Sequence, residues 1–533
     1  MRANKNIPLV ILLFLVGICI LYPYHNFQIS LAQGDNGRDL YCFRQTLEGK
    51  IPYRDYWWVY GPLMPYYYSF FYKLFGINIQ SILVGKIALQ LVCGIFVFLI
   101  CSSFAARSLA TIAALWFWAF SPDFAYTYNH IGGIMLLFSI IYFIFQYIKE
   151  PRVVWIIFSF ISVFILGFIK INVGIFNLIA VLICFLALGV WQKNLTGQKR
   201  NLLICGALVI PGVTFLIYAL LFHGLPAHYV GQCLPYLKSN YHYYTSPLIA
   251  IKTLGQIYVS HLFSNRFNLL FGIIIILSAV KVLQMFTSSK SDKNLKNNIT
   301  TVLFTLCLFF VVNCHEFIAS GIPYQVYWTT PFTILMIFFV LSQAIADFPK
   351  TISRLLYGTL VIIVFLNVCG TWGIIQSYKI SRRYLDFPTA KIYCANSPEW
   401  ISTVTETSDY LKGVLKNGEM FFALPYEPLY YFLLERNSPT RELIFFDHLN
   451  IAEEQEHDII RQLEDKNVNF ILISSRISSP TKGLGTFGKT YCPVLSKYFD
   501  DHFQAVASFG DWQTPPTISW EHHGTKILKR VVR

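Results

Sequence analysis

The sequence predicts an α-helical protein that crosses a membrane many times and ends in a small α/β domain. Hydrophobic residues make up 55% of the 533 positions and charged residues only 13%, whereas soluble domains carry about 25% charged residues. Apolar runs of about 20 residues, enough to cross a bilayer as a helix, recur along most of the chain. From about Gln376 onward these runs shorten and charged residues return to an ordinary density.

About eleven membrane spans are expected from the apolar runs. They are Ile7–Tyr22, Ile82–Phe104, Leu109–Phe120, Ile131–Ile148, Val153–Phe168, Ile171–Trp191, Leu202–Phe222, Phe267–Met285, Thr301–Ile318, Pro331–Ala346 and Leu355–Ile375. The first run follows Arg2 and Lys5, and no small-x-small cleavage motif comes promptly after it. We therefore expect an uncleaved first helix and not a signal peptide.

The positions of lysine and arginine predict the orientation in the membrane. With the N-terminus inside, the cytoplasmic turns hold Arg107, Lys149, Arg152, Lys193, Lys199, Arg200, Lys290, Lys293, Lys296, Lys350 and Arg354. The opposite turns Ser121–His130 and Asn313–Trp328 hold no cation. Because cytoplasmic loops are enriched in lysine and arginine, we expect a multi-pass protein of the cell (inner or plasma) membrane with a cytoplasmic N-terminus. The net charge of +14 then reflects orientation and contact with anionic lipids, and no nucleic-acid partner is expected.

Two domains are expected along the chain. Residues 1–375 form a transmembrane domain whose first outer loop covers residues 25–81. Residues 376–533 form an extracytoplasmic α/β domain, because an odd number of spans places the C-terminus on the outer side.

The C-terminal part alternates strand and helix signals. FFALP (Phe421–Pro425) and NFILISS (Asn469–Ser475) predict buried strands, and AEEQEHDIIRQLEDK (Ala452–Lys466) predicts an amphipathic helix. Cys394 and Cys492 lie in this polar part, where an extracytoplasmic disulfide between them stays open from the sequence.

The most polar stretch of the N-terminal half is Gly34–Gly76. It contains Asp35 and Asp39, four residues apart, which would share a face of a helix or converge in a loop. A carboxylate there can act as a general base toward a hydroxyl or an amine, or it can bind a divalent cation. The alternative is structural: Asp35 caps a helix and Asp39 pairs with Arg38 or Arg44. The stretch ends in YGPLMPYYYSFFYKLFG, which predicts a helix at the membrane surface.

Further candidates lie in the remaining outer turns and at the ends of spans. Lys170, in GFIKINVG, separates two apolar spans, and Lys86 lies inside the start of the second span. A charge at such a depth is costly and predicts a functional group, although a lysine can also extend its ammonium toward the interface. The outer turns also offer candidates to line a pocket with the first loop, or else hydrated turn residues: Asp123, His130, His315 and Glu316. No P-loop, GxGxxG, HExxH or GxSxG motif occurs in a persuasive context.

The order of these segments resembles the GT-C membrane glycosyltransferases. The resemblance is to the bacterial branch related to protein O-mannosyltransferases and the lipid A aminoarabinose transferase. It rests on one span followed by GRDLY and GKIPYRD in an outer loop, then YGPLMPYYYSFFYKLFG before the second span. GFIKINVG, the outer turn around His315 and FFALPYEPLYYFLLERNSPT in the C-terminal domain extend it.

The resemblance implies transfer of a hexosyl or pentosyl group from a polyprenyl-phosphate donor. It implies inversion at the outer face and a lipid, polysaccharide or protein acceptor. The implied acidic residues are Asp35, as base or acceptor-positioning group, then Asp39 and Asp123. The implied cations at the donor phosphate are Lys170, Lys86, Arg38 and His315. Some members use a divalent cation and others do not, and no other cofactor is expected.

Two other classes compete with this interpretation. A transporter or lipid flippase predicts polar residues through the bilayer and inverted repeats, whereas the polar groups here gather on one face. A non-catalytic assembly protein built on the same fold is the third hypothesis.

Overall fold

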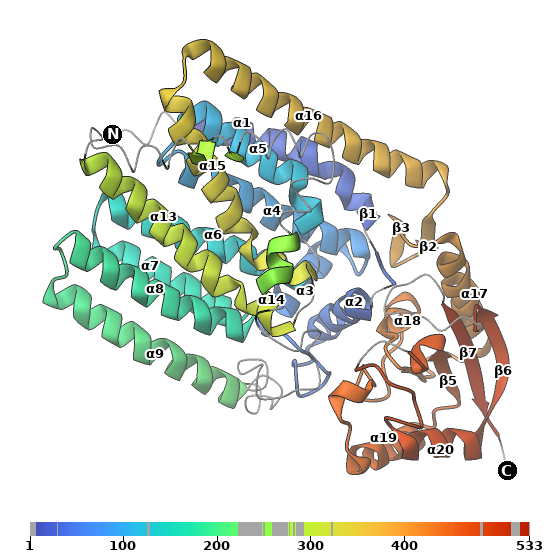
Figure 1. Ribbon diagram of the computed structural model, residues 1–533. Coiled ribbons are helices and arrows are strands. Elements are labelled where there is room, and N and C mark those ends of the chain that lie inside the picture. Colours follow the sequence, from blue (N-terminus) through green and yellow to red (C-terminus); the bar gives the residue numbers. More distant parts are fainter. Residues whose placement is uncertain are drawn as a thin grey trace. The chain divides into compact units, whose positions relative to one another are not determined.

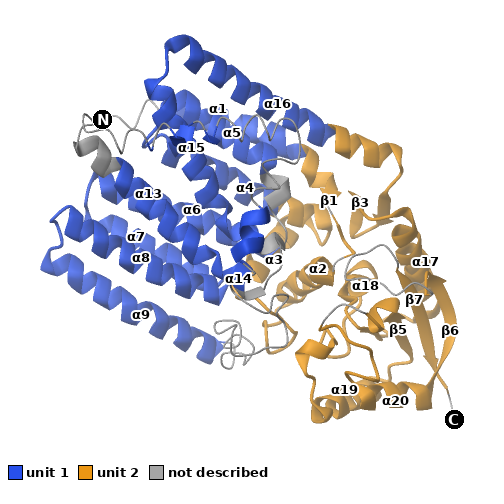
Figure 2. Cartoon of the chain, in the orientation of Figure 1, with its two compact units in different colours: residues 1–22, 86–237, 242–372 blue, residues 23–85, 238–241, 373–533 orange. Residues whose placement is uncertain are grey.

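The computed structural model describes most of the chain (Figure 1). The described residues are 7–28, 30–32, 34–124, 128–221, 293–320, 323–479, 483–512 and 523–531, with short stretches between 248 and 283. The chain divides into two compact units (Figure 2). Unit 1 comprises residues 1–22, 86–237 and 242–372, and unit 2 comprises residues 23–85, 238–241 and 373–533.

Unit 1 consists of apolar helices. They are α1 (Ile7–Leu21), α4 (Ile79–Cys101), α5 (Arg107–Phe124), α6 (Tyr128–Lys149), α7 (Val153–Gly167), α8 (Ile171–Trp191), α9 (Gly197–Leu221), α13 (Lys293–Asn313), the short α14 (His315–Ser320), α15 (Thr330–Asp347) and α16 (Lys350–Ile380). A 3₁₀ turn, Pro323–Thr329, joins α14 to α15. Consecutive helices α6, α7 and α8 pack side by side, and α13 packs between α8 and α15.

Eight of the described helices are long and apolar enough to cross a membrane, and the helical segments Arg107–Phe120 and Val153–Gly167 are shorter apolar ones. Ten of the eleven predicted spans thus have a helix at their position. The other, Phe267–Met285, falls largely outside the described residues. The structure therefore confirms a multi-pass membrane protein, as far as the described part of the chain goes.

Small residues let the helices of unit 1 approach one another closely. The indole of Trp118 on α5 packs against Gly17 of α1 and Gly94 of α4, and a Cβ on Gly94 would lie 2.2 Å from that ring. The same indole donates a hydrogen bond to the Gln90 carbonyl, at 3.0 Å. Because the hydrophobic effect does not draw helices together in lipid, such close van der Waals packing and hydrogen bonding hold them together.

Unit 2 joins the first loop to the C-terminal part of the chain. Strand β1 (Phe27–Gln28) pairs in parallel with β3 (Ala390–Cys394), and β3 pairs antiparallel with β2 (Tyr384–Phe387). Two helices of the loop, α2 (Gly34–Leu47) and α3 (Leu63–Phe75), pack on each other. Helix α3 confirms the helix that the aromatic stretch predicts.

A second, mixed sheet of unit 2 has the strand order β4-β5-β7-β6. Strand β4 (Phe421–Leu424) is parallel to β5 (Phe470–Ser474), and β7 (Gly524–Arg530) is antiparallel to β5 and to β6 (Phe503–Gly510). The unit's remaining helices are α17 (Pro398–Val414), α18 (Pro428–Leu433), α19 (Glu453–Asp465) and α20 (Pro493–His502).

The predicted elements of the α/β part are confirmed. Strands β4 and β5 and helix α19 occupy the expected positions, and Ile459 and Leu463 of α19 are buried in the core. Cys394 and Cys492 do not form a disulfide. Both are buried free thiols in the structure.

Candidate active site

Two glycines bring helix α2 against helix α18 and the loop before it. A Cβ on Gly34 would lie 2.1 Å from the ring of Tyr426, and a Cβ on Gly37 would lie 2.7 Å from Leu429 Cβ. Only a residue without a side chain fits at either position without a shift of its neighbour. The glycines of GDNGRD thus allow the first turn of α2, which carries Asp35, to contact the chain 391 residues further on.

Asp35, Arg38, Asp39 and Tyr426 form one hydrogen-bonded group, which we call the Asp35 cluster. Tyr426 Oη donates to Asp35 Oδ1 at 2.6 Å and accepts from Arg38 Nη1 at 2.9 Å. Arg38 Nη1 also donates to Asp35 Oδ1, at 3.2 Å. Arg38 Nη2 and Nε donate to Asp39 Oδ1 at 2.7 Å and 3.0 Å. The pairing of Asp39 with Arg38 is therefore confirmed.

Three aromatic rings of the first loop lie close to the buried Arg38 guanidinium. Arg38 is 1% exposed, and its Cζ lies 5.2 Å from the ring centroids of Trp58 and Tyr60 and 5.8 Å from that of Trp57. The aromatic residues of the first loop thus form a cage for this cation. Its charge is balanced by Asp35 and Asp39, so Arg38 acts first as an internal partner of the two carboxylates.

The two carboxylates of the cluster differ in access. The Asp39 side chain is fully buried, whereas 27% of the Asp35 side chain is exposed. Both donors to Asp35 meet its Oδ1 atom, and no described residue donates to Oδ2. Asp35 also lies in the first turn of α2, where the helix dipole favours a negative charge. Of the two, Asp35 is the one that can meet a substrate, and Asp39 holds Arg38.

A second group, which we call the Lys170 cluster, consists of Lys170, Asn172, His315 and Glu316. Lys170 precedes α8 as its N-cap, and its Nζ lies 2.5 Å from Glu316 Oε2. Asn172 Nδ2 donates to Glu316 Oε1. Lys170 and Glu316 are 6% and 5% exposed, so the ammonium that the sequence predicts as functional is a member of a buried ion pair.

Both ring nitrogens of His315 face oxygen atoms. Nδ1 lies 2.7 Å from the carbonyl oxygen of Val312, which can only accept, so Nδ1 carries a proton. Nε2 lies 3.4 Å from Glu316 Oε1. The imidazole stacks on Phe176 with ring centroids 4.1 Å apart.

A tryptophan covers the Lys170 cluster. Trp328 lies in the turn before α15, and Lys170 Nζ is 5.4 Å from its ring centroid. A Cβ on Gly133 of α6 would lie 2.5 Å from the same indole, so this glycine makes room for it. His130 meets this indole edge to face, with ring centroids 5.1 Å apart.

The other predicted site residues lie in unit 1. Lys86, in α4, is 9% exposed and its Nζ lies 5.8 Å from the Tyr128 ring centroid. Asp123 belongs to the last turn of α5, and its side chain lies outside the described part of the structure.

The described residues hold no group of three or more His, Cys, Asp or Glu side chains that could bind a metal ion. Asp35 Oδ2 alone provides too few ligands for a site made of protein atoms, since Ca²⁺ takes six to eight oxygen ligands and Mg²⁺ six. The residues described here therefore do not by themselves form a cation site, and no step below depends on one.

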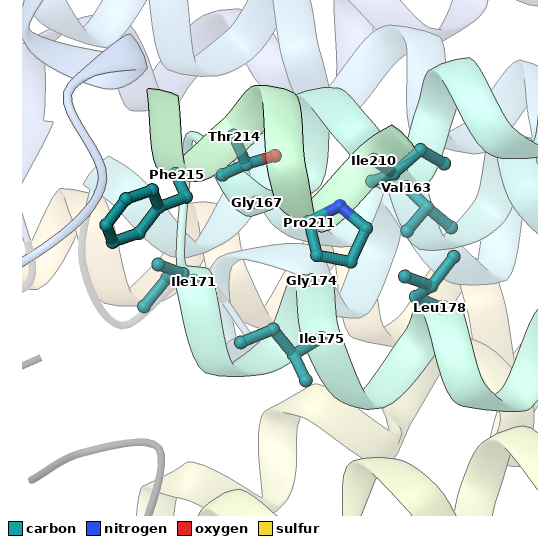
Figure 3. A pocket seen from close by; sticks show the side chains of 10 residues that line it. All are labelled: Val163, Gly167, Ile171, Gly174, Ile175, Leu178, Ile210, Pro211, Thr214 and Phe215. Carbon is teal, nitrogen blue, oxygen red and sulfur yellow. The ribbon is translucent and has the colours of Figure 1, made fainter. Parts of the chain in front are cut away.

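An apolar cavity of about 240 Å³ lies between α7, α8 and α9 (Figure 3). Its lining residues are Val163, Gly167, Ile171, Gly174, Ile175, Leu178, Ile210, Pro211, Thr214 and Phe215. Thr214 carries the only polar side-chain atom among them. The cavity thus offers almost nothing to a sugar or a phosphate, and the polar chemistry belongs to the two clusters.

Tyr426 and Asn172 were not among the sequence-based candidates. Asn172 lies two residues after Lys170, so proximity was the only available signal. Glu316 was a candidate together with His315, but its contact with Lys170 was not predicted. Tyr426 lies in FFALPYEPLYYFLLERNSPT, a segment that the resemblance includes, but nothing in that segment indicates a contact with Asp35.

Comparisons with known proteins identify the fold. No family model matches the sequence, and no curated protein matches it. The crystal structure of ArnT from Cupriavidus metallidurans bound to undecaprenyl phosphate is similar, with 11% identity, 98% of each chain covered and a TM-score of 0.56. The apo structure of the same protein gives 11% identity, 99% of this chain and 98% of that chain, and a TM-score of 0.50.

An oligosaccharyltransferase from Archaeoglobus fulgidus, in complex with zinc and sulfate, is also similar. Its identity is 12%, with 88% of this chain and 68% of that chain covered and a TM-score of 0.47. At such low identity the comparison with ArnT shows the fold alone. The chain has a GT-C-like fold over nearly its full length, which confirms the resemblance at the level of structure.

Proposed function

We propose that the chain is a membrane glycosyltransferase that uses a polyprenyl-phosphate sugar as donor. It transfers a hexosyl or pentosyl group, with inversion, to a lipid, polysaccharide or protein acceptor at the extracytoplasmic face. The observation that carries the proposal is Asp35, a part-exposed carboxylate with one oxygen held and one open. The GT-C-like fold supports it, and the similar ArnT structure contains undecaprenyl phosphate.

Asp35 acts as the general base in this proposal. Its Oδ2 atom removes the proton from an acceptor hydroxyl or amine as that group attacks the anomeric carbon of the donor. The new glycosidic bond forms as the bond from the anomeric carbon to the phosphate oxygen breaks. The electron pair of the broken bond leaves with the polyprenyl phosphate, so one direct displacement inverts the anomeric centre.

Cations assist departure of the lipid phosphate. A phosphate leaves more readily when positive groups balance the charge that develops on it. Lys86, Lys170 and His315 are proposed for this role. Arg38 supports the role indirectly, because its contacts are with Asp35, Asp39 and Tyr426.

The location follows from the charge distribution of the turns. The N-terminus lies in the cytoplasm, and unit 2, which contains Asp35, lies outside. A donor with a long isoprenoid tail and an acceptor of the cell envelope would both meet Asp35 at the membrane plane.

Asp35→Asn tests the proposal. General-base catalysis contributes about 10²–10⁴-fold, so transfer should fall by at least about a hundredfold while the protein stays in the membrane. The donor is first identified as the polyprenyl-linked sugar that accumulates when the gene is deleted. Transfer of that labelled sugar is then measured in membranes that contain equal amounts of each variant.

Asp386→Asn is the matched control. Asp386 is an exposed carboxylate on β2 of the same unit, and its replacement should leave the rate at the level of the unchanged protein. Equal transfer by Asp35→Asn and the unchanged protein would overturn the assignment of the site.

A further inference from the structure

Tyr426 connects the C-terminal part of the chain directly to the proposed base. Its hydroxyl donates to Asp35 Oδ1 at 2.6 Å and accepts from Arg38 Nη1 at 2.9 Å. Tyr426 is 4% exposed, and its ring packs on Gly34 at the start of α2. The phenol therefore has one geometry, set by a donor, an acceptor and a packed ring.

We infer that Tyr426 is a positioning residue for Asp35, so that the C-terminal domain completes the active site. The inference rests on the proposed function of Asp35. With Oδ1 held by the Tyr426 hydroxyl and the Arg38 guanidinium, the carboxylate cannot rotate without breaking two hydrogen bonds. Its Oδ2 atom is then kept in one orientation toward the acceptor, which lowers the cost of reaching a reactive geometry.

The protonation state of Tyr426 agrees with this role. Burial raises the pKa of Tyr426 well above its ordinary value, an effect that the positive Arg38 opposes and the negative Asp35 reinforces. The hydroxyl thus remains a donor throughout the pH range in which enzymes work. A charge-assisted hydrogen bond from a neutral donor to a carboxylate is stronger than one between neutral groups.

Residues that follow strands β4 and β5 of the α/β domain hold Tyr426 in place. The residue follows β4, and Arg476, which follows the parallel strand β5, donates to its carbonyl oxygen at 3.4 Å. The Arg476 guanidinium also lies 5.8 Å from the Tyr426 ring centroid and 3.6 Å from Glu427 Oε1. Glu427 in turn accepts from Ser474 Oγ at 2.7 Å. The C-terminal ends of the adjacent strands β4 and β5 thus hold the tyrosine in place.

Tyr426→Phe removes the hydroxyl and keeps the ring. Tyr431→Phe is the matched control, since Tyr431 lies on the adjacent helix α18, is equally buried, and its hydroxyl accepts from the Ala423 amide at 2.8 Å. Both variants are assayed beside Asp35→Asn for turnover, for the donor KM and for the pH dependence of turnover. The amount in the membrane and the thermal midpoint of each variant are measured in parallel.

For Tyr426→Phe we expect turnover to fall about ten- to a hundredfold, as for loss of one hydrogen bond to a charged group, with the donor KM unchanged. The acid limb of the pH profile should move to higher pH, because the ionised form of Asp35 loses a donor. A purely structural role would lower the active fraction equally at every pH and leave the shape of the profile unchanged. Tyr431→Phe should keep the profile of the unchanged protein.

The outcomes separate this inference from the proposed function. An inactive Asp35→Asn together with a Tyr426→Phe of normal turnover and profile would overturn the inference alone. Transfer by Asp35→Asn would overturn the proposed site itself. If Tyr426→Phe does not accumulate, 3,5-difluorotyrosine at position 426 keeps the ring and strengthens the donor. It should move the acid limb to lower pH, and an unchanged limb would contradict the inference.

Discussion

The Glu316 carboxylate offsets the cost of burying the Lys170 ammonium among apolar helices. An isolated ammonium between two apolar helices would be costly. Here Glu316 Oε2 lies 2.5 Å from Lys170 Nζ, and Asn172 donates to the other carboxylate oxygen. Removing one member of a buried pair is far more harmful than removing both, because it leaves an uncompensated charge.

Replacement of these two residues tests that interdependence. Glu316→Gln should lower the free energy of unfolding by about 3–5 kcal/mol, since Lys170 loses its counter-charge. The double variant Lys170→Met/Glu316→Gln should be more stable than Glu316→Gln alone. Thermal unfolding midpoints in one detergent measure both effects, with the exposed Lys149→Met as a control that should change little. Additive losses in the double variant would show that the two charges are not coupled.

Helix α2 is the element on which the Asp35 cluster depends. Its position relies on Gly34 and Gly37 and on Arg44, which donates to the carbonyl oxygens of Tyr431 at 3.2 Å and Arg436 at 2.6 Å. A glycine inside a helix usually destabilises it by about 1 kcal/mol relative to alanine. At Gly37 the close approach to α18 outweighs that cost.

Gly37→Ala should therefore destabilise the protein even though alanine favours helix. Its Cβ would lie 2.7 Å from Leu429 Cβ and 2.8 Å from the Leu429 amide nitrogen, and overpacking typically costs about 1–3 kcal/mol. Transfer activity should fall as well, because α2 carries Asp35. Gly413→Ala on α17, where a Cβ meets nothing within 4 Å, should be neutral or slightly stabilising. A thermal midpoint of Gly37→Ala equal to that of Gly413→Ala would refute the packing argument.

Apolar periodicity was sufficient to place helices, and side-chain partners over long separations were not predictable. The runs that predict α4 and α6 differ from the observed helices by a few residues, and the run that predicts α8 has the same bounds as the helix. Each run is long enough to cross a bilayer, so its position is well defined. Within α2 the sequence offered Arg38 as a partner of Asp39, since the two are adjacent. It gave no indication of Tyr426, because that contact depends on how the α/β domain folds against α2. The same holds for the contact of Lys170 with Glu316, which are 146 residues apart.

At the scale of the whole molecule, unit 2 constrains the number of membrane crossings. Its two main segments, residues 23–85 and 373–533, pair through β1 and β3 and through the contacts of α2 with α18. Both segments must therefore lie on the same side of the membrane, and an even number of crossings must separate them. Between the two segments the described helices are α4 to α9, α13, α15 and α16, of which seven are long enough to cross a membrane and α5 and α7 are shorter apolar helices. With α5 and α7 counted as crossings, as the sequence predicts, they provide nine. The predicted span Phe267–Met285, which lies largely outside the described residues, would provide the tenth.

Short epitopes inserted at exposed turns test this topology. Insertions at Gly49 and at Gly418, which lie in the two segments of unit 2, should both be reached by antibody from the outside of intact, right-side-out membranes. Insertions at Lys193, between α8 and α9, and at Pro349, between α15 and α16, should be reached only after the membrane is opened. All four positions are exposed, so access depends on the side of the membrane.

Lys193 and Pro349 share a side only if an even number of crossings separates them, and α9, α13 and α15 account for three. Opposite accessibility of Lys193 and Pro349 would therefore contradict the predicted span at Phe267–Met285, and opposite accessibility of Gly49 and Gly418 would contradict the composition of unit 2.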